Sequence, residues 1–100
     1  MKTIIENLNK VFENRIRLAI MSLLVVNDQV DFNSLKEMME LTDGNLASHI
    51  TMLEKNNYVK VKKKFIGKKP STSYSVTERG RKEFSEHIDA LEKIINQAQQ

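Results

Sequence analysis

The sequence predicts a mainly α-helical domain with one β-hairpin, an α+β fold class. Two changes of pattern along the chain predict it. Apolar residues recur at helical spacing from residue 3 to residue 55, in segments separated by short polar turns. From residue 59 to residue 76 apolar residues instead alternate with polar ones, as they do along a half-buried strand. Helical spacing then returns and continues to about residue 98.

Length and composition suit a single soluble domain. The chain has 100 residues, of which 40% are apolar and 29% charged, enough to bury a core. It has no cysteine, which excludes disulfides, thiolate metal ligands and cysteine nucleophiles. The longest apolar run, Leu23–Val26, is too short to cross a membrane, and the first ten residues lack the apolar core of a signal peptide. We therefore expect a cytoplasmic protein without a membrane partner.

Two helices are predicted in the first quarter of the chain. Residues 3–12 place apolar side chains at helical spacing. Residues 15–26 are apolar on more than one side, so we expect this helix to lie at the centre of the core. A turn over residues 27–29 and a very short strand over residues 30–32 should follow.

A pair of helices joined by almost no linker is predicted next. Asn33 is a candidate N-cap for the first of them. Thr42 is a candidate N-cap for the second, and Leu41 and Leu46 stand at the spacing of a hydrophobic staple around it. Two helices joined by so short a turn are the signature of a helix-turn-helix.

The second helix of the pair has one apolar stripe and one polar face. Leu46, Ile50 and Leu53 share the stripe. The opposite face carries small or hydrogen-bonding side chains that allow close approach to base edges, although an ordinary exposed helix is the simpler alternative. Its members are Gly44, Asn45, Ser48, Thr51, Met52 and Lys55.

Positive charge is concentrated in one block. From Lys55 to Lys82 there are ten Lys and Arg residues and one acid, so this segment carries +9 and the other 72 residues carry −6. Such a block points to a polyanion partner. It includes a predicted hairpin whose turn is expected over residues 67–70 and whose cationic residues include Lys62, Lys64, Lys68 and Lys69. The alternative is a lysine-rich edge strand whose charges only discourage aggregation.

The last helix should begin after Thr77 as N-cap, and Gly80 in its first turn suggests close approach to another backbone. Its apolar residues follow a coiled-coil-like spacing that exceeds the needs of a compact core. We expect this seam and the apolar residues of the first helix to meet across a two-fold axis, the alternative being pairing within a monomer. The predicted interface contains Ile4, Ile5, Leu8, Phe84, Ile88, Leu91 and Ile95.

The order helix, helix, short strand, helix, helix, hairpin, helix is that of a winged helix-turn-helix. The block LEKNNYVKVKKKFIGKKPSTSYSVTERGRKEF resembles the wing and following helix of bacterial regulators of the MarR/ArsR type. In that family a Tyr-x-hydrophobic-Thr-x-x-Gly segment enters the last helix, and here it is Tyr74–Gly80. The resemblance covers roughly residues 12–90, and small stand-alone winged helix DNA-binding domains match the whole length. It implies a transcriptional regulator.

We therefore expect one domain over residues 1–100, with a winged-helix core at 12–77 and dimerisation helices at 1–11 and 78–100. The expected function is that of a homodimeric, sequence-specific regulator of double-stranded DNA, acting as a repressor. The alternative is a winged helix that contacts proteins only. Neither a cofactor nor a small-molecule effector is identified. The candidate DNA-binding residues are Gly44, Asn45, Ser48, His49, Thr51, Lys55, Lys62, Lys64, Lys68 and Lys69.

No catalytic or metal-binding constellation stands out in the sequence, so an enzyme is not expected. His49 and His87 lie in separate predicted helices without cysteine partners. His87 follows Glu83 by four residues, which is most simply a surface ion pair. His49 flanks the apolar stripe and could either reach DNA or pack at the helix edge. Asp43 complements the helix dipole but would place a negative charge beside phosphates.

Overall fold

The computed structural model describes residues 5–98 and contains four α-helices, one 3-10 helix and a three-stranded antiparallel sheet within that range. The mainly helical α+β prediction is therefore confirmed. The elements are η1 (Lys10–Phe12), α2 (Arg15–Val26), β1 (Val30–Asp31), α3 (Phe32–Met39), α4 (Asp43–Lys55), β2 (Val59–Ile66), β3 (Lys69–Val76) and α5 (Glu78–Ala98).

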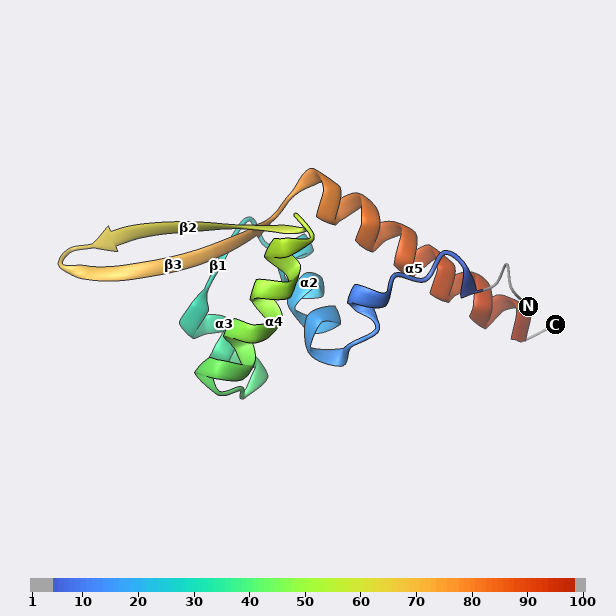
Figure 1. The fold of residues 1–100 in the computed structure, drawn as a ribbon, viewed down its shortest axis with the longest axis horizontal. Helices are drawn as coiled ribbons and strands as arrows, with labels where there is room; N and C mark the ends of the chain where they lie inside the picture. Colours follow the sequence, from blue (N-terminus) through green and yellow to red (C-terminus); the bar gives the residue numbers. More distant parts are fainter. Residues whose placement is uncertain (1–4, 99–100) are drawn as a thin grey trace.

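The molecule is elongated, with principal extents of 57 × 26 × 21 Å. In Figure 1 the β2–β3 hairpin projects at one end and α5 extends to the other, while α2, α3 and α4 pack between them. The strand order is β1-β3-β2, so the very short β1 covers one side of the hairpin base. No helix within residues 5–98 combines the length and the apolar character that a membrane span requires.

The core is centred on α2, as its two-sided apolar pattern predicted. Ile20, Met21 and Leu24 are completely buried in it. Leu46 and Leu53 of α4 reach the same cluster, which confirms the apolar stripe. Each such fully buried aliphatic side chain stabilises the fold by about 1.5–3 kcal/mol. The stripe therefore fixes which face of α4 points outward.

The helix-turn-helix is capped at both helix starts, and one cap differs from the prediction. Thr42 caps α4 by accepting a hydrogen bond from the Asn45 N–H at 3.2 Å, as expected. Helix α3 is capped by Asp31 instead of Asn33, because the Asp31 carboxylate accepts from both the N–H and the hydroxyl of Ser34. These bonds, the hydroxyl bond first, lower the pKa of Asp31. The helix therefore begins at Phe32, two residues earlier than a cap at Asn33 would allow.

The predicted N-terminal helix over residues 3–12 is wrong for residues 6–12. Residues 6–9 are turn and irregular chain, and only Lys10–Phe12 form one 3-10 turn. Asn9 caps this turn, since its side chain accepts from the Val11 N–H at 2.9 Å. Asparagine offers the backbone such local bonds in competition with a helix. The turn directs Phe12 into the core, where it is buried.

The hairpin turn is tighter than predicted. It consists of Gly67 and Lys68 alone, and Gly67 takes the positive φ of 67° that such a two-residue loop needs. Pro70 is therefore already in β3, opposite Phe65, and not in the turn. Pro lacks an N–H and cannot donate a hydrogen bond to a neighbouring strand, so it is tolerated in a strand only at a position where no such bond is needed.

The start of α5 confirms two predictions. The Thr77 hydroxyl accepts from the Gly80 N–H at 2.8 Å, so Thr77 caps the helix. Gly80 is buried against the backbone of Tyr58, and a methyl group added there would overlap the Tyr58 carbonyl oxygen. The same carbonyl accepts from the Thr77 N–H at 3.0 Å. Glycine at this position lets α5 pass directly over the beginning of β2.

Candidate nucleic-acid interface

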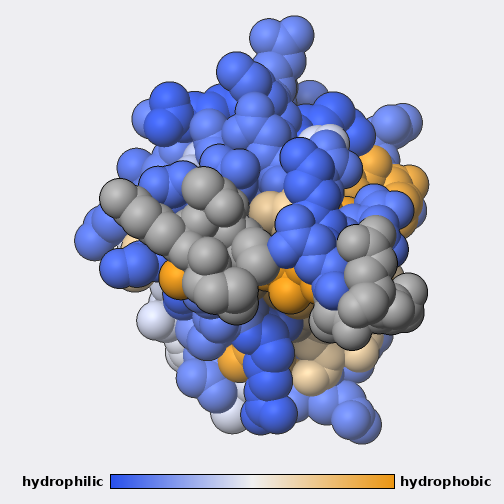
Figure 2. Space-filling model, turned by 90° about the vertical axis from the view of Figure 1, so that its right-hand side faces the viewer, coloured by the Kyte–Doolittle hydropathy of each residue, from blue (hydrophilic) through white to orange (hydrophobic). Residues whose placement is uncertain are grey.

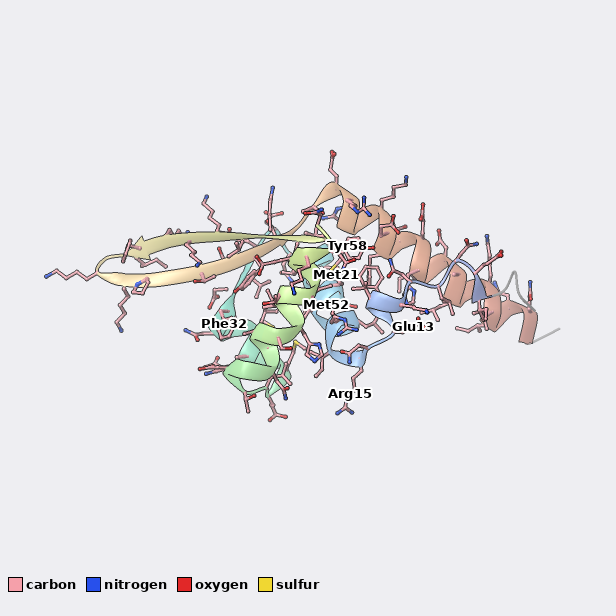
Figure 3. The ribbon with its side chains drawn as sticks, in the orientation of Figure 1. Glu13, Arg15, Met21, Phe32, Met52 and Tyr58 are labelled. Carbon is pink, nitrogen blue, oxygen red and sulfur yellow. The ribbon has the colours of Figure 1, made fainter. Side chains whose placement is uncertain are left out.

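The outer face of α4 is exposed along its whole length. Its small and hydrogen-bonding residues lie opposite the buried stripe and are all exposed. Figure 3 shows Met52 on this surface and the Arg15 side chain extending from the body on the side where α4 begins. The exposed face comprises Gly44, Asn45, Ser48, Thr51, Met52 and Lys55.

Two hydrogen bonds restrict what this face can offer a ligand. The Thr51 hydroxyl donates to the Ala47 carbonyl at 2.8 Å, so toward a base it presents an acceptor and a methyl group. The Asn45 backbone N–H is already used by the Thr42 cap, but the Asn45 amide side chain is exposed. Asn45 and Ser48 are therefore the residues on this face best able both to donate to and accept from a base edge.

The negative charge at the start of α4 is paired. Nζ of Lys36 in α3 lies 2.9 Å from the Asp43 carboxylate, the one ion pair within residues 5–98. Lys36 is a third exposed and Asp43 mostly exposed, so the pair contributes little to stability. The pair still matters for the charge of the surface, because the positive charge of Lys36 offsets the negative charge of Asp43. Without Lys36, the Asp43 carboxylate would repel an anionic ligand at the start of α4.

His49 lies between α4 and α2 and is half-buried. Its Nδ1 is 3.1 Å from Nη1 of Arg17, whose Nε donates to the Val11 carbonyl at 2.7 Å. Burial first, and the Arg17 charge second, lower the pKa of His49. The ring is thus favoured in its neutral form, with Nδ1 accepting from Arg17 and Nε2 carrying the proton. Packing at the helix edge accounts for this residue, and only Nε2 remains for an external ligand.

The pleat of the hairpin separates its lysines onto two faces. Cross-strand pairing places Lys62 opposite Ser73 and Lys64 opposite Ser71, on one face. Lys63 lies on the other face, which continues from the buried Val59. All the wing lysines are exposed, including Lys68 in the turn and Lys69 at the start of β3.

The face that carries Lys63 is the one turned toward α4. Tyr74 lies on it, directly opposite Val61, and is buried against the helices. Burial raises the pKa of Tyr74, and the carboxylate of Glu54 near the end of α4 raises it further. Lys63 was not among the predicted DNA-binding residues. The period-2 alternation with Val59 would have singled it out, because every second residue from a core position faces the same way.

The predicted dimer seam is only partly free. Phe84 is buried in the core of the protomer, where its ring meets Phe12 edge-to-face at 5.3 Å, so its assignment to an intersubunit surface is corrected. Ile88 and Ile95 are 39% and 55% exposed, and Ile5 is also exposed. Leu8 and Leu91 are half-buried, and Ile4 lies outside the described residues.

Figure 2 views the molecule from the end where the termini lie. Hydrophobic residues appear there as separate spots on a largely hydrophilic surface. The N-terminal segment packs along α5 of its own chain, since the Asn9 N–H donates to His87 Nδ1 at 2.9 Å. Contact within one monomer, the alternative to a two-fold seam, is therefore present between Asn9 and His87.

His87 belongs to a buried polar network that the sequence did not reveal. It is 3% exposed, and Asn9 connects it to the Tyr58 hydroxyl, which accepts from Asn9 Nδ2 at 3.0 Å. The expected surface pair with Glu83 is wrong, because the described part of the chain holds no such ion pair and the ring points inward against Phe12. Burial lowers the pKa of His87, and the Glu13 carboxylate opposes this shift. Residues 5–98 also contain no cluster of potential ligands that could hold a metal ion.

An exposed polar helix presented by a helix-turn-helix, with a basic hairpin beside it, defines a winged-helix DNA-binding protein. The sequence agrees with this class. Residues 16–95 match the family described as the winged helix DNA-binding domain, and the chain belongs to that family.

Similar proteins come from archaea and bacteria. An uncharacterized protein of Methanocaldococcus jannaschii, MJ0432, is 38% identical over 79 residues, which are 79% of this chain and 86% of that protein. The structure of a transcriptional regulator homologue from Pyrococcus horikoshii has a TM-score of 0.89 at 31% identity, over 98% of both chains. A putative MarR-family regulator from Porphyromonas gingivalis shares the fold, with a TM-score of 0.65 at 18% identity over 91% of this chain and 84% of its own. The winged-helix fold that the resemblance implied is thereby confirmed.

Proposed function

We propose that the protein is a sequence-specific transcriptional regulator that binds double-stranded DNA as a homodimer and acts as a repressor. The observation that carries the proposal is the polar outer face of α4, exposed opposite a fully buried stripe and followed directly by a basic wing. Such a face, free of Leu or aromatic anchors, suits base edges better than a protein surface.

In this proposal α4 enters the major groove and reads bases through Asn45 and Ser48. Thr51 contributes its methyl group or an accepted hydrogen bond, and Gly44 allows close approach at the helix start. The wing lysines neutralise phosphates or enter the adjacent minor groove, which adds affinity without reading sequence. The ion pair between Lys36 and Asp43 supports the placement, because it offsets the negative charge closest to the phosphates.

Dimerisation supplies the length of sequence that one winged helix cannot read. The exposed Ile88 and Ile95 on α5 support it, together with half-buried Leu91 between them. Two α4 helices about 34–36 Å apart would contact half-sites one helical turn apart. A dimer on such a palindrome would block access of polymerase to an overlapping promoter, which is the basis for proposing repression.

Duplex DNA titrated by fluorescence anisotropy at several salt concentrations tests the proposal. If the dimer engages about six phosphates, log K should fall against log salt with a slope of roughly −5. Selection from a random duplex library then recovers the preferred site, which should be a palindrome. Absence of binding at low salt would refute DNA recognition, and an asymmetric single half-site would refute the two-fold arrangement.

A further inference from the structure

The tip of the wing exposes apolar side chains that have no role in the core. Phe65 is 73% exposed and Ile66 is 64% exposed, although they are adjacent on β2. Pro70 stands opposite Phe65 on the same face of the hairpin and is also exposed. None of the three belongs to the hydrophobic core or to the residues packed against it.

Single exposed apolar residues are common on protein surfaces, but these three lie close together in the sequence of the hairpin tip and have charged neighbours. Leaving a Phe side chain in water forgoes about 1.5–3 kcal/mol of burial. Here Phe65 and Pro70 lie on one face of the tip and Ile66 on the opposite face, with four lysines nearby in the strands and the turn. A cationic rim around an apolar point is complementary to a polyanion that offers an apolar interior. The surrounding lysines are Lys63, Lys64, Lys68 and Lys69.

The tip is carried on a stiff arm. Strands β2 and β3 pair over their full eight residues, from Val59 opposite Val76 to Ile66 opposite Lys69. Eight residues of strand span roughly 26 Å. The loop between them has two residues, and Figure 1 shows the hairpin extending well beyond the helices. The apolar tip is thus presented at a distance from the body with little freedom to fold back.

We propose that the tip of the wing, with Phe65 on one face and Ile66 on the other, is a wedge that enters the minor groove of DNA and unstacks a base step beside the site read by α4. Apolar side chains of this kind are known to pry apart base steps from the minor groove, while neighbouring lysines contact the flanking phosphates. This inference rests on the proposed function, since the wing follows α4 directly and reaches the groove adjacent to the one that α4 enters.

A wedge would select DNA by how easily a base step unstacks, whereas the polar face of α4 would select it by contacts with base edges. Pyrimidine–purine steps such as TA unstack easily, whereas A-tracts are stiff. The protein should therefore prefer a flexible step at the position of the wing, without any base contact there. A membrane surface or another protein could also cover an apolar, cationic tip, and the experiment separates these cases.

The test uses tryptophan as a reporter, because the chain contains none. In Phe65→Trp the emission should be strongly quenched by DNA and become inaccessible to acrylamide, as stacking against bases requires. Val26→Trp is the matched control, since Val26 is 76% exposed but lies at the end of α2, outside the wing. Its emission should not change. The DNA is the selected site with either a TA step or an A-tract where the wing falls.

A paired variant measures the energetic effect. Phe65→Ser with Ile66→Ser should lower affinity for the TA site roughly tenfold, about 1.4 kcal/mol, and leave the A-tract site little changed. The salt slope should stay at the wild-type value because no phosphate contact is lost. Lys68→Ala with Lys69→Ala should show the reverse, a flatter slope and an unchanged preference for TA.

The outcomes distinguish the wedge from the proposed function. DNA binding by wild type with unquenched Phe65→Trp emission and an intact TA preference in the Ser variant would refute the wedge alone. No binding of wild type to any duplex would refute the proposed function as well. A blue shift of the Phe65→Trp emission with phosphatidylcholine–phosphatidylserine vesicles but not with DNA would assign the tip to a membrane surface and overturn the wedge. Concentration-dependent burial of the reporter without DNA would assign it to a protein contact, with the same result.

Discussion

Gly80 in the first turn of α5 lies against the backbone of Tyr58 so closely that no side chain can be accommodated between them. An added methyl group would overlap the Tyr58 carbonyl oxygen and lie 2.9 Å from its Cα. This contact lets α5 lie directly against the residue that precedes the wing.

Gly80→Ala should therefore destabilise the protein, although alanine is the better helix former by about 1 kcal/mol. Forced overlap with a backbone typically costs about 1–3 kcal/mol net, which lowers Tm by roughly 4–8 °C for each kcal/mol. Gly44→Ala is the matched control, because nothing lies within 4 Å of its added methyl group. It should stabilise the chain by about 0.4–1 kcal/mol in the same thermal melts. Equal effects of the two substitutions would contradict the packing at Gly80.

The hydrogen bond from the Asn9 N–H to His87 Nδ1 predicts a pH-dependent stability. Because the pKa of His87 is lowered by burial, the unfolded chain binds the proton more readily than the folded one. The stability that neutral His87 contributes is complete above the unfolded pKa of about 6.5. It is lost as the pH falls from there through the lower pKa of the folded state. His49 shifts in the same direction. Urea unfolding should thus give a lower free energy at pH 5.5 than at pH 7.5.

His87→Asn separates the two histidines. The shorter side chain cannot titrate, so the variant should be less stable at pH 7.5 but lose less stability between pH 7.5 and pH 5.5. We attribute the stability that His87→Asn still loses between pH 7.5 and pH 5.5 to His49. That remaining loss should disappear in the double variant His87→Asn with His49→Gln, in which Arg17 no longer faces a histidine. An unchanged pH dependence in His87→Asn would show that His87 does not control it.

The ion pair between Lys36 and Asp43 predicts opposite effects on DNA affinity from its two members. Asp43→Asn removes the negative charge at the start of α4 and should tighten binding to all duplexes. Lys36→Gln leaves that charge unopposed and should weaken it. Either change should alter the free energy of unfolding by less than about 1 kcal/mol, because the pair is exposed. Anisotropy titrations of both variants measure these affinities. If Asp43→Asn left the DNA affinity unchanged, the start of α4 would lie away from the phosphates.

The wing and α4 should contribute differently to binding. Lys68→Ala with Lys69→Ala should weaken specific and random DNA about equally and flatten the salt slope by up to about one unit per lost phosphate contact. Asn45→Ala should reduce discrimination between the selected site and random DNA by roughly 1–3 kcal/mol. Equal loss on both DNAs from Asn45→Ala would show that a different face of α4 reads the bases.

The exposed stripe of α5 predicts a separable dimer contact. Ile88→Asp with Ile95→Asp places charges that a buried interface could not pair, so the variant should be a folded monomer by light scattering with most of its DNA affinity lost. Phe84→Ala is the control, because Phe84 is part of the core and its truncation should cost about 3–5 kcal/mol of protomer stability. A wild-type protein that is monomeric at high micromolar concentration would contradict the proposed dimer.

The features that the sequence determined by itself are those coded within a few neighbouring residues. The Thr42 cap, the buried stripe of Leu46, Ile50 and Leu53, and the two strands of the wing were all predicted and are confirmed. The helix periodicity repeats over a single turn or two, and a capping bond spans three residues, so no distant contact is needed to specify either. The same local coding predicted α4 as an exposed polar helix followed by a basic hairpin.

Tertiary structure alone decided the parts whose contacts join distant segments. Asn9 meets His87 across 78 residues and Tyr58 across 49, so no local pattern reveals that the N-terminal segment leaves its helical spacing to complete this network. Phe84 fits a surface seam by its spacing but is buried, because Phe12 arrives beside it from the other end of the chain. Periodicity shows which residues share a face, whereas burial depends on what the rest of the chain packs against that face.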